Sequence, residues 1–162
     1  MSLIVSDASP VHYLVLIQAV EVLPKLFSKV VIPEYIVSVE LQNPKTPLSV
    51  QEWVRHLPGW VEVRKPSRLE SLGLQMGEEH AISLALELSA PVLLDEREAR
   101  KIAEARGLVV VGLVGIIERA ASRNLLDIRA AFAALRKTNF RISESLVDAA
   151  IRRHVSVKPP QT

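Results

Sequence analysis

Residues 92–111 read VLLDEREARKIAEARGLVVV, and this stretch decides the class of fold. An apolar run at residues 92–94 is followed by a helical pattern over residues 96–105. Gly107 then breaks the helix, and residues 108–111 form a second apolar run. Short apolar strands that alternate with helices build a parallel sheet, because right-handed crossovers return the chain to the same end of the sheet. The stretch therefore predicts an α/β fold with a central, mostly parallel sheet.

The same alternation continues on both sides of this stretch. Further strands are predicted at residues 3–6, 29–32 and 60–64. Further helices are predicted at residues 10–18, 34–41, 50–57, 78–88, 114–123, 127–137 and 143–154. Ser9 is expected to cap the first of these helices, with Pro10 at its first position, an arrangement that favours a helix start. The last three helices make a helical C-terminal segment.

The length and composition are those of one compact domain. The chain has 162 residues, of which 49% are hydrophobic, and this is enough for a substantial core. Charges and prolines interrupt every apolar run well short of a membrane span. We expect a single domain at residues 1–156, a disordered tail at residues 157–162, no membrane association and a cytoplasmic location.

The composition also excludes several kinds of chemistry. Without cysteine there is no disulfide, no zinc-thiolate site and no thiol nucleophile. The four histidines have no zinc-binding spacing. Only 4% of residues are aromatic, so we expect a bound nucleic acid to be held by its backbone rather than by base stacking.

The net charge of +2 is too small to indicate a class of binding partner, so only the local distribution of charged residues is informative. Arg97, Arg100 and Lys101 lie within one predicted helix and are candidates for contacts with the phosphate groups of RNA. The alternative is that they belong to a solvated helix face. The sequence leaves both interpretations open.

Two aspartates directly follow predicted strands. Asp7 comes after the strand at residues 3–6, and Asp95 after the strand at residues 92–94. Such carboxylates gather at the carboxyl edge of a parallel sheet, where these folds bind ligands, and they select hard cations such as Mg²⁺ or Mn²⁺. Each also has an alternative role, because Asp7 could form a turn and Asp95 could form a helix-capping box with Glu98.

Two glutamates on predicted helices complete a candidate set of four acids. Glu40 lies on the helix face that should meet the sheet, and Glu78 lies in the first turn of its helix. The alternatives are an ion pair at the core edge for Glu40, and an acid that complements the helix dipole for Glu78. Secondary candidates near the four acids are Ser9, Glu79 and Glu96.

Several short motifs occur in an order that resembles the PIN-domain family, in particular its small prokaryotic branch. The motifs are VSDASP at residues 5–10, VE at 39–40, GEEHAISLA at 77–85, LLDEREAR at 93–100, glycines at 112 and 115, and NFRIS at 139–143. Each motif is loose by itself, but their order and spacing together are fairly specific. The resemblance runs over nearly the whole chain.

This resemblance implies a three-layer α/β/α fold, a site for Mg²⁺ or Mn²⁺, and ribonuclease activity. It places the acids of the family on Asp7, Glu40, Glu78 and Asp95. It also implies that the protein is the toxin of a toxin-antitoxin pair, with RNA as substrate, a small antitoxin as partner and self-association as a homodimer.

The leading hypothesis is hydrolysis of RNA phosphodiester bonds by water that the metal activates, with no protein nucleophile. Two departures from the family pattern support an alternative, a PIN-like module with weakened catalysis that binds RNA or a protein. Leu113 stands where relatives often have threonine, and His80 where a second acid is frequent. A receiver-type phosphoacceptor domain is disfavoured, because no apolar run ends in the lysine that it would need.

Overall fold

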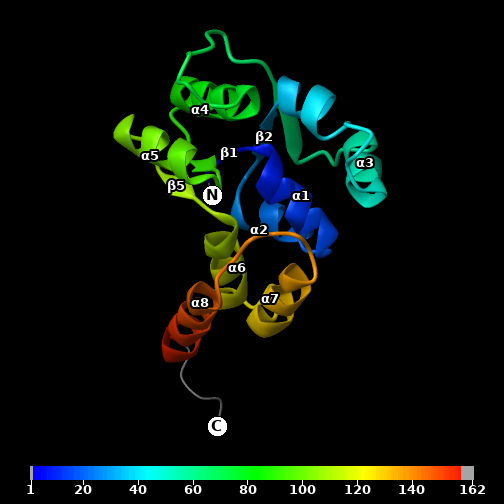
Figure 1. Cartoon of the computed structure of the whole chain (residues 1–162), viewed down its shortest axis with the longest axis vertical. Helices are drawn as coiled ribbons and strands as arrows, with labels where there is room; N and C mark the ends of the chain where they lie inside the picture. Colours follow the sequence, from blue (N-terminus) through cyan, green and yellow to red (C-terminus); the bar gives the residue numbers. More distant parts are fainter. Residues whose placement is uncertain (1, 158–162) are drawn as a thin grey trace.

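A five-stranded parallel sheet forms the centre of the molecule (Figure 1), in a computed structural model that describes residues 2–157. The strands are β1 (Ile4–Ser6), β2 (Val30–Pro33), β3 (Val61–Arg64), β4 (Val92–Leu93) and β5 (Val110–Val111). They lie in the order β3-β2-β1-β4-β5, and every neighbouring pair is parallel. The predicted α/β class is confirmed, and each strand falls where it was expected.

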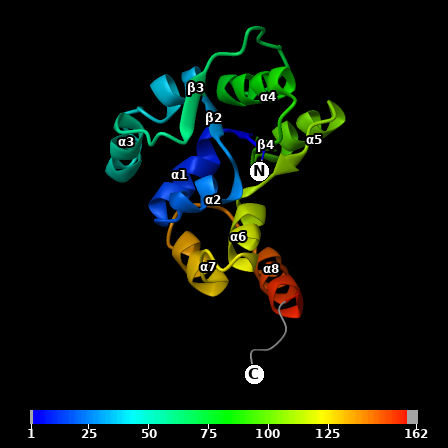
Figure 2. The ribbon, with the colours of Figure 1, turned by 180° about the vertical axis from the view of Figure 1, so that it is seen from behind.

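Helices cover both faces of the sheet and give the three-layer arrangement (Figures 1 and 2). The helical elements are α1 (Ala8–Leu16), a 3-10 turn η1 (Val20–Val22), α2 (Leu23–Leu26), a π-helical segment η2 (Ile36–Glu40), α3 (Leu48–Arg55), α4 (Met76–Leu88), α5 (Arg97–Ala105), α6 (Leu113–Ser122), α7 (Ile128–Arg136) and α8 (Glu144–Val157). In Figure 2, α4 and α5 lie on one side of the sheet and α1 and α2 on the other. The last three helices form the predicted C-terminal segment.

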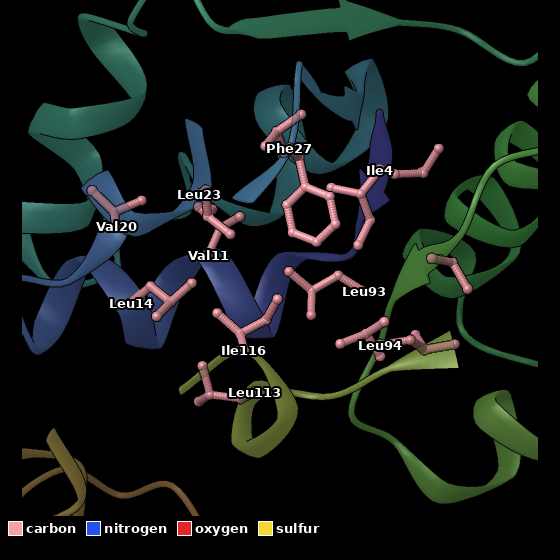
Figure 3. Close-up of a cluster of buried hydrophobic side chains, with 14 of the residues drawn as sticks. Ile4, Val11, Leu14, Val20, Leu23, Phe27, Leu93, Leu94, Leu113 and Ile116 are labelled. Carbon is pink, nitrogen blue, oxygen red and sulfur yellow. The ribbon is translucent and has the colours of Figure 1, made fainter. Parts of the chain in front are cut away.

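The core is built from aliphatic side chains, as the low aromatic content requires. Figure 3 shows Val11 of α1, Leu93 of β4 and Ile116 of α6 in one cluster, and all three are fully buried. Burying a side chain of this kind contributes roughly 1.5–3 kcal/mol to folding. Because α6 takes part in this cluster, the C-terminal segment shares the core of the sheet.

The first helix begins earlier than predicted. α1 starts at Ala8, so Asp7 and not Ser9 is the residue before its first turn, and the predicted Ser9 cap is wrong. Pro10 is third in the helix, where its missing N–H costs nothing, because the first four N–H groups of a helix have no partner within it. The Asp7 side chain makes no capping hydrogen bond to α1, which leaves its carboxyl for the sheet edge.

The strand order creates a switch point at the centre of the sheet. β1 and β4 are neighbours, but the chain leaves β1 toward β2 and leaves β4 toward β5. In open α/β sheets, ligands bind in the crevice that such a reversal opens beyond the carboxyl ends of the strands. Asp7 follows β1 directly and Asp95 follows β4 closely, so both flank this crevice.

The C-terminal helix α8 ends at Val157, a little beyond its predicted end at residue 154. Apart from Val157, the tail predicted at residues 157–162 lies outside the described residues. No helix in the described part of the chain is long and apolar enough to cross a membrane.

Candidate metal centre

A cleft of about 1210 Å³ opens at the switch point. Its acidic lining consists of Asp7, Glu40, Glu78, Asp95 and Glu96. The four acids of the predicted set are therefore brought together from four separate parts of the chain. Two other predicted residues, Ser9 and Arg97, also line the cleft.

Asp7 is buried at the end of β1, with 7% of its surface exposed. Its main-chain N–H donates a hydrogen bond to the Leu93 carbonyl at 3.0 Å, which fixes it beside β4. Burial raises the pKa of Asp7 to about 7; the neighbouring Ala8 N–H opposes the rise, and the charges of Glu40 and Asp95 add to it. Such a carboxyl is stabilised at neutral pH by a proton or by a nearby cation.

Glu78 lies in the first turn of α4 and faces the same cleft. Its Oε1 accepts a hydrogen bond from the Gln75 N–H at 3.3 Å, whereas its Oε2 is buried with no donor directed at it. Burial, together with the charges of Asp7 and Glu96, raises the pKa of Glu78 to about 7, and the Gln75 N–H opposes the rise. The carboxyls of Glu78 and Glu96 can hydrogen-bond to each other only when one of them carries a proton.

Glu40 ends the π-helical segment η2 and is half-buried beside Gly77. Burial raises the pKa of Glu40, and the charge of Glu78 adds to the rise. A Cβ at Gly77 would stand 2.6 Å from Glu40 Cδ and 2.7 Å from its Oε2. The glycine before the Glu78-Glu79 pair therefore leaves the space that the Glu40 carboxyl occupies.

Asp95 is held on its inner side by the main chain. Its Oδ1 accepts a hydrogen bond from the Leu113 N–H at 2.9 Å, and a Cβ at Gly112 would stand only 3.1 Å from that oxygen. Its Oδ2 is buried without a donor. Burial raises the pKa of Asp95, while the Leu113 N–H and the charge of Arg100 oppose the rise.

The helix-capping role considered for Asp95 belongs to its neighbour. Glu96 is the residue before α5, and its carboxylate accepts a hydrogen bond from the Ala99 N–H at 2.8 Å. This bond and others from the same helix start lower the pKa of Glu96. The alternative role of Asp95 in a capping box with Glu98 is therefore ruled out, because the helix begins one residue later than that box requires.

Glu79 points away from the acids and holds a loop. Its carboxylate accepts hydrogen bonds from the N–H groups of Leu72 at 2.5 Å and Leu74 at 3.4 Å. These bonds lower the pKa of Glu79. Of the two adjacent glutamates, it is Glu78 that the structure places with the other acids.

Two positions that depart from the family pattern direct their side chains elsewhere. The Leu113 side chain is fully buried, and Figure 3 shows it near Ile116 in the core. His80 stacks on Tyr35, with ring centroids 4.9 Å apart, and both line a separate pocket of about 260 Å³. Within the described residues, neither side chain lines the acid cleft.

The three predicted RNA-contacting residues lie beside the cleft on α5. Arg97 is exposed and lines the cleft itself. Arg100 is half-buried, and its Nη1 donates to the Leu94 carbonyl at 3.1 Å. Lys101 is exposed and makes a loose ion pair with Glu98, with 3.7 Å between Nζ and Oε1. All three also line a second groove next to the cleft.

Tyr13, Asn139 and Arg141 line the cleft but were not among the predicted site residues. The Tyr13 hydroxyl donates to Asn139 Oδ1 at 2.7 Å and ties α1 to the segment before α8. Burial raises the pKa of Tyr13, and the charge of Asp95 raises it further. The NFRIS motif indicated the segment that contains Asn139 and Arg141, but no sequence signal indicated its contact with α1.

The donor set fits a hard divalent cation. The acidic residues are all carboxylates, which Mg²⁺ and Mn²⁺ prefer, and buried oxygens of Glu78 and Asp95 lack a donor. A bound cation would also stabilise the ionised carboxylates of Asp7 and Glu78, and so offset the effects of burial and charge repulsion that raise their pKa to about 7. Within residues 2–157, no three acidic or histidine side chains are close enough together to coordinate one ion. The carboxyl groups would therefore have to move toward one another to bind it.

Fold and cleft together define an α/β domain with a carboxylate-lined site at its switch point. The model of the DUF3368 family, described as a PIN domain, matches residues 3–156. The chain therefore belongs to the PIN-domain family, and the resemblance seen in the sequence is confirmed. PIN domains are typically nucleases that use divalent metal ions.

Among solved structures, the chain is similar to a PilT N-terminus domain protein from the hyperthermophilic archaeon Sulfolobus solfataricus P2. The two are 16% identical, with a TM-score of 0.48, and the match covers 88% of this chain and 100% of the other. No curated protein matches the chain significantly.

Proposed function

We propose that the protein is a metal-dependent endoribonuclease that hydrolyses phosphodiester bonds of RNA, with Mg²⁺ or Mn²⁺ as its cofactor. The observation that carries this proposal is the convergence of Asp7, Glu40, Glu78 and Asp95 on one cleft, in a chain that belongs to a family of nucleases. Buried carboxyl oxygens without a donor, such as Glu78 Oε2 and Asp95 Oδ2, destabilise a fold. A function that requires them explains why the chain keeps them together.

Asp7 and Asp95 are the residues that would hold the ion directly, with Glu40 and Glu78 completing its shell or orienting water. When bound, such an ion makes water a stronger nucleophile and stabilises negative charge on the phosphate and the leaving oxygen. The carboxyls must lose their protons before they bind a cation. Because the pKa of Asp7 and of Glu78 is raised to about 7, metal affinity should fall as the pH drops below that value.

Other side chains of the cleft can bind and orient the substrate. Arg97 and Arg141 are exposed, and neither forms an ion pair within residues 2–157, so both are available to phosphate oxygens. The bond from Tyr13 to Asn139 holds the segment that carries Arg141 beside the acids. The Ser9 hydroxyl, which does not cap α1, can donate to a phosphate oxygen.

The proposal extends to a role as the toxin of a toxin-antitoxin pair in the cytoplasm, where RNA is available. The support is the sequence resemblance to the small prokaryotic branch of the family. A small antitoxin that covered the acidic cleft would block access of RNA to it. Self-association as a homodimer belongs to the same proposal.

Cleavage of RNA in the presence and absence of metal tests the proposed activity. Purified protein should cut a mixed set of structured and single-stranded RNAs with Mg²⁺ or Mn²⁺ and leave them intact with EDTA. Asp95→Asn should lower the cleavage rate by roughly 10²- to 10³-fold, the usual effect of losing a group that stabilises charge in the transition state. Asp148→Asn, at an exposed acid of α8, is the matched control and should leave the rate unchanged.

The other results of this assay are also informative. Cleavage that is unchanged in Asp95→Asn would reveal a contaminating nuclease or a different site. Folded wild-type protein that binds RNA but does not cut it with Mn²⁺ present would favour the alternative, a PIN-domain module that acts by binding.

Gly77→Ala should displace the Glu40 carboxyl without harming the fold. The atoms nearest to the added methyl belong to the end of the Glu40 side chain, which can move, and alanine favours a helix over glycine by about 1 kcal/mol. We expect cleavage to fall by roughly 10- to 100-fold, because small displacements of a positioned group have effects of that size. The thermal unfolding midpoint should not fall.

The control for this variant is Gly59→Ala, at a glycine with no atom within 4 Å of an added Cβ. It should change neither cleavage nor stability. Full cleavage by Gly77→Ala would show that the reaction does not depend on where the Glu40 carboxyl lies.

A further inference from the structure

The Arg100 side chain is bonded to the main chain next to Asp95. It comes from the first turn of α5 and is half-buried, and its Nη1 donates to the Leu94 carbonyl at 3.1 Å. Leu94 directly precedes Asp95, and its own N–H donates to the Val111 carbonyl of β5 at 2.9 Å. The guanidinium therefore holds the chain at the point where it passes from β4 to Asp95.

Gly112 supplies the space that this guanidinium occupies. A Cβ at Gly112 would collide with Arg100 Nη1 and would stand 3.6 Å from Arg100 Cζ and 3.1 Å from Asp95 Oδ1. Both groups therefore converge on one point of the main chain, directly before the Leu113 N–H that donates to Asp95 Oδ1 at 2.9 Å. The φ angle of Gly112 is −100°, which alanine adopts as well, so the glycine is needed here for room and not for its backbone.

Arg100 differs from the other two cations of α5 beside the cleft. Arg97 and Lys101 are exposed, whereas Arg100 is half-buried. Arg100 makes no ion pair with any acid in residues 2–157, yet its charge opposes the rise in the pKa of Asp95. Its bond to the main chain fixes it next to this carboxylate, whereas an arginine that binds RNA must be free to reach a phosphate.

We propose that Arg100 is a positioning residue for the metal centre and not a contact for RNA. It keeps Asp95 Oδ1 on the Leu113 N–H, so that the other oxygen, Oδ2, which has no donor, stays in place for the cation. Partners of a metal ligand fix its orientation, and removing one typically lowers metal affinity or activity by about 10- to 100-fold. The inference rests on the proposed function, because that function assigns Asp95 to the cation.

The first measurement needs no metal. Amide hydrogen exchange, followed by NMR in EDTA, reports how often the Leu113 N–H leaves Asp95 Oδ1. Arg100→Ala should speed this exchange about three- to tenfold, the effect of weakening one hydrogen bond. The matched reference is the Ala130 N–H, which donates to Asp127 Oδ1 at 2.8 Å at the start of α7 and should exchange as in the wild type. Equal acceleration of both amides would show a general loss of stability and overturn the positioning role.

The second measurement is Mn²⁺ affinity without RNA, by isothermal titration calorimetry, for Arg100→Ala, Gly112→Ala and the double variant. Removing the Arg100 charge by itself favours a cation, so the decisive change is Gly112→Ala, which keeps every charge and pushes the guanidinium aside. It should weaken Mn²⁺ binding about tenfold. In the Arg100→Ala background the added methyl enters the space that the guanidinium leaves, and the same change should weaken binding about threefold or less. An equal loss in both backgrounds would mean that the methyl acts on Asp95 directly, and would overturn the inference.

RNA binding separates a positioning role from a phosphate contact. With labelled RNA in EDTA, Arg100→Ala should leave the slope of log affinity against log salt unchanged, whereas loss of a phosphate contact lowers it by about 0.7. A fall of that size would overturn the inference. Arg129→Ala, at an exposed arginine of α7, is the control for the loss of one positive charge and should match the wild type in all three measurements. Circular dichroism with thermal unfolding should show that every variant is folded.

The proposed function can fail separately. If the folded wild type binds Mn²⁺ but never cuts RNA, the ribonuclease is refuted, while the Leu113 exchange and the Mn²⁺ affinities still decide the role of Arg100. If the wild type cuts RNA with Mn²⁺ but neither the exchange nor the Mn²⁺ affinities respond as expected, only the positioning role is refuted.

Discussion

Asp7→Asn is expected to lower RNA cleavage by roughly 10³-fold or more and, at the same time, to make the metal-free protein more stable above neutral pH. The loss of cleavage follows because asparagine keeps the shape of the side chain but not the charge that holds a cation. The gain in stability follows because Asp7 is buried among other carboxyls and makes no capping hydrogen bond to α1.

The sign of the pH dependence comes from the direction of the pKa shift. Burial raises the pKa of Asp7 from 3.8 to about 7, so the folded chain holds this proton more tightly than the unfolded chain. The contribution of Asp7 to the stability of the metal-free protein should therefore be largest below the ordinary pKa and be lost as the pH rises through about 7. The rise from 3.8 to about 7 corresponds to at most about 4 kcal/mol, so above that pH Asp7→Asn should stabilise the metal-free protein by roughly 2–4 kcal/mol, or about 4–16 °C in the unfolding midpoint.

Thermal unfolding in EDTA at about pH 5 and about pH 8, compared with unfolding in Mn²⁺, measures this effect. The benefit of Asp7→Asn should shrink at the lower pH, and Mn²⁺ should stabilise the wild type more than the variant, since binding to the folded state alone raises stability. Asp127→Asn is the control, because Asp127 also precedes a helix but caps it, accepting a bond from the Ala130 N–H at 2.8 Å. Destabilisation by Asp7→Asn at both pH values would instead assign Asp7 a structural role.

Glu78→Gln and Glu79→Gln should have opposite effects although the residues are adjacent. Glu78→Gln should lower cleavage by roughly 10²- to 10³-fold, because the lost charge belongs to the acid cleft. Glutamine can still accept the Gln75 N–H bond, so α4 should remain capped. Glu79→Gln should cleave RNA at nearly the wild-type rate but unfold at a lower temperature, because its charged acceptor holds the loop N–H groups of Leu72 and Leu74.

Each variant is the control for the other, measured by the cleavage rate with saturating Mn²⁺ and by thermal unfolding in EDTA. If Glu79→Gln abolished cleavage and Glu78→Gln did not, the assignment of the two glutamates would be reversed. If both variants lost cleavage in proportion to stability, the loss would come from unfolding and not from the site.

The sequence by itself determined the class of fold and the acids that the sheet edge gathers. Apolar runs, helical periodicity and breakers such as Gly107 are local signals, because they depend on neighbours within a few turns of chain. A carboxylate at or just beyond the end of a buried strand, such as Asp7 or Asp95, must lie at the carboxyl edge of a parallel sheet, so its position follows from the strand alone. The order of the short motifs along the chain indicated the family.

Only the tertiary structure decided which neighbouring side chains face the cleft and what else surrounds it. Glu78 and Glu79 are separated by about 100° around their helix, so the way α4 packs on the sheet determines which of them joins the acids. The Tyr13 to Asn139 bond joins residues 126 positions apart, and the second groove, next to the acid cleft, is likewise assembled from distant segments. Such pairings depend on how α6, α7 and α8 pack against the rest of the chain, and local sequence patterns do not predict that packing.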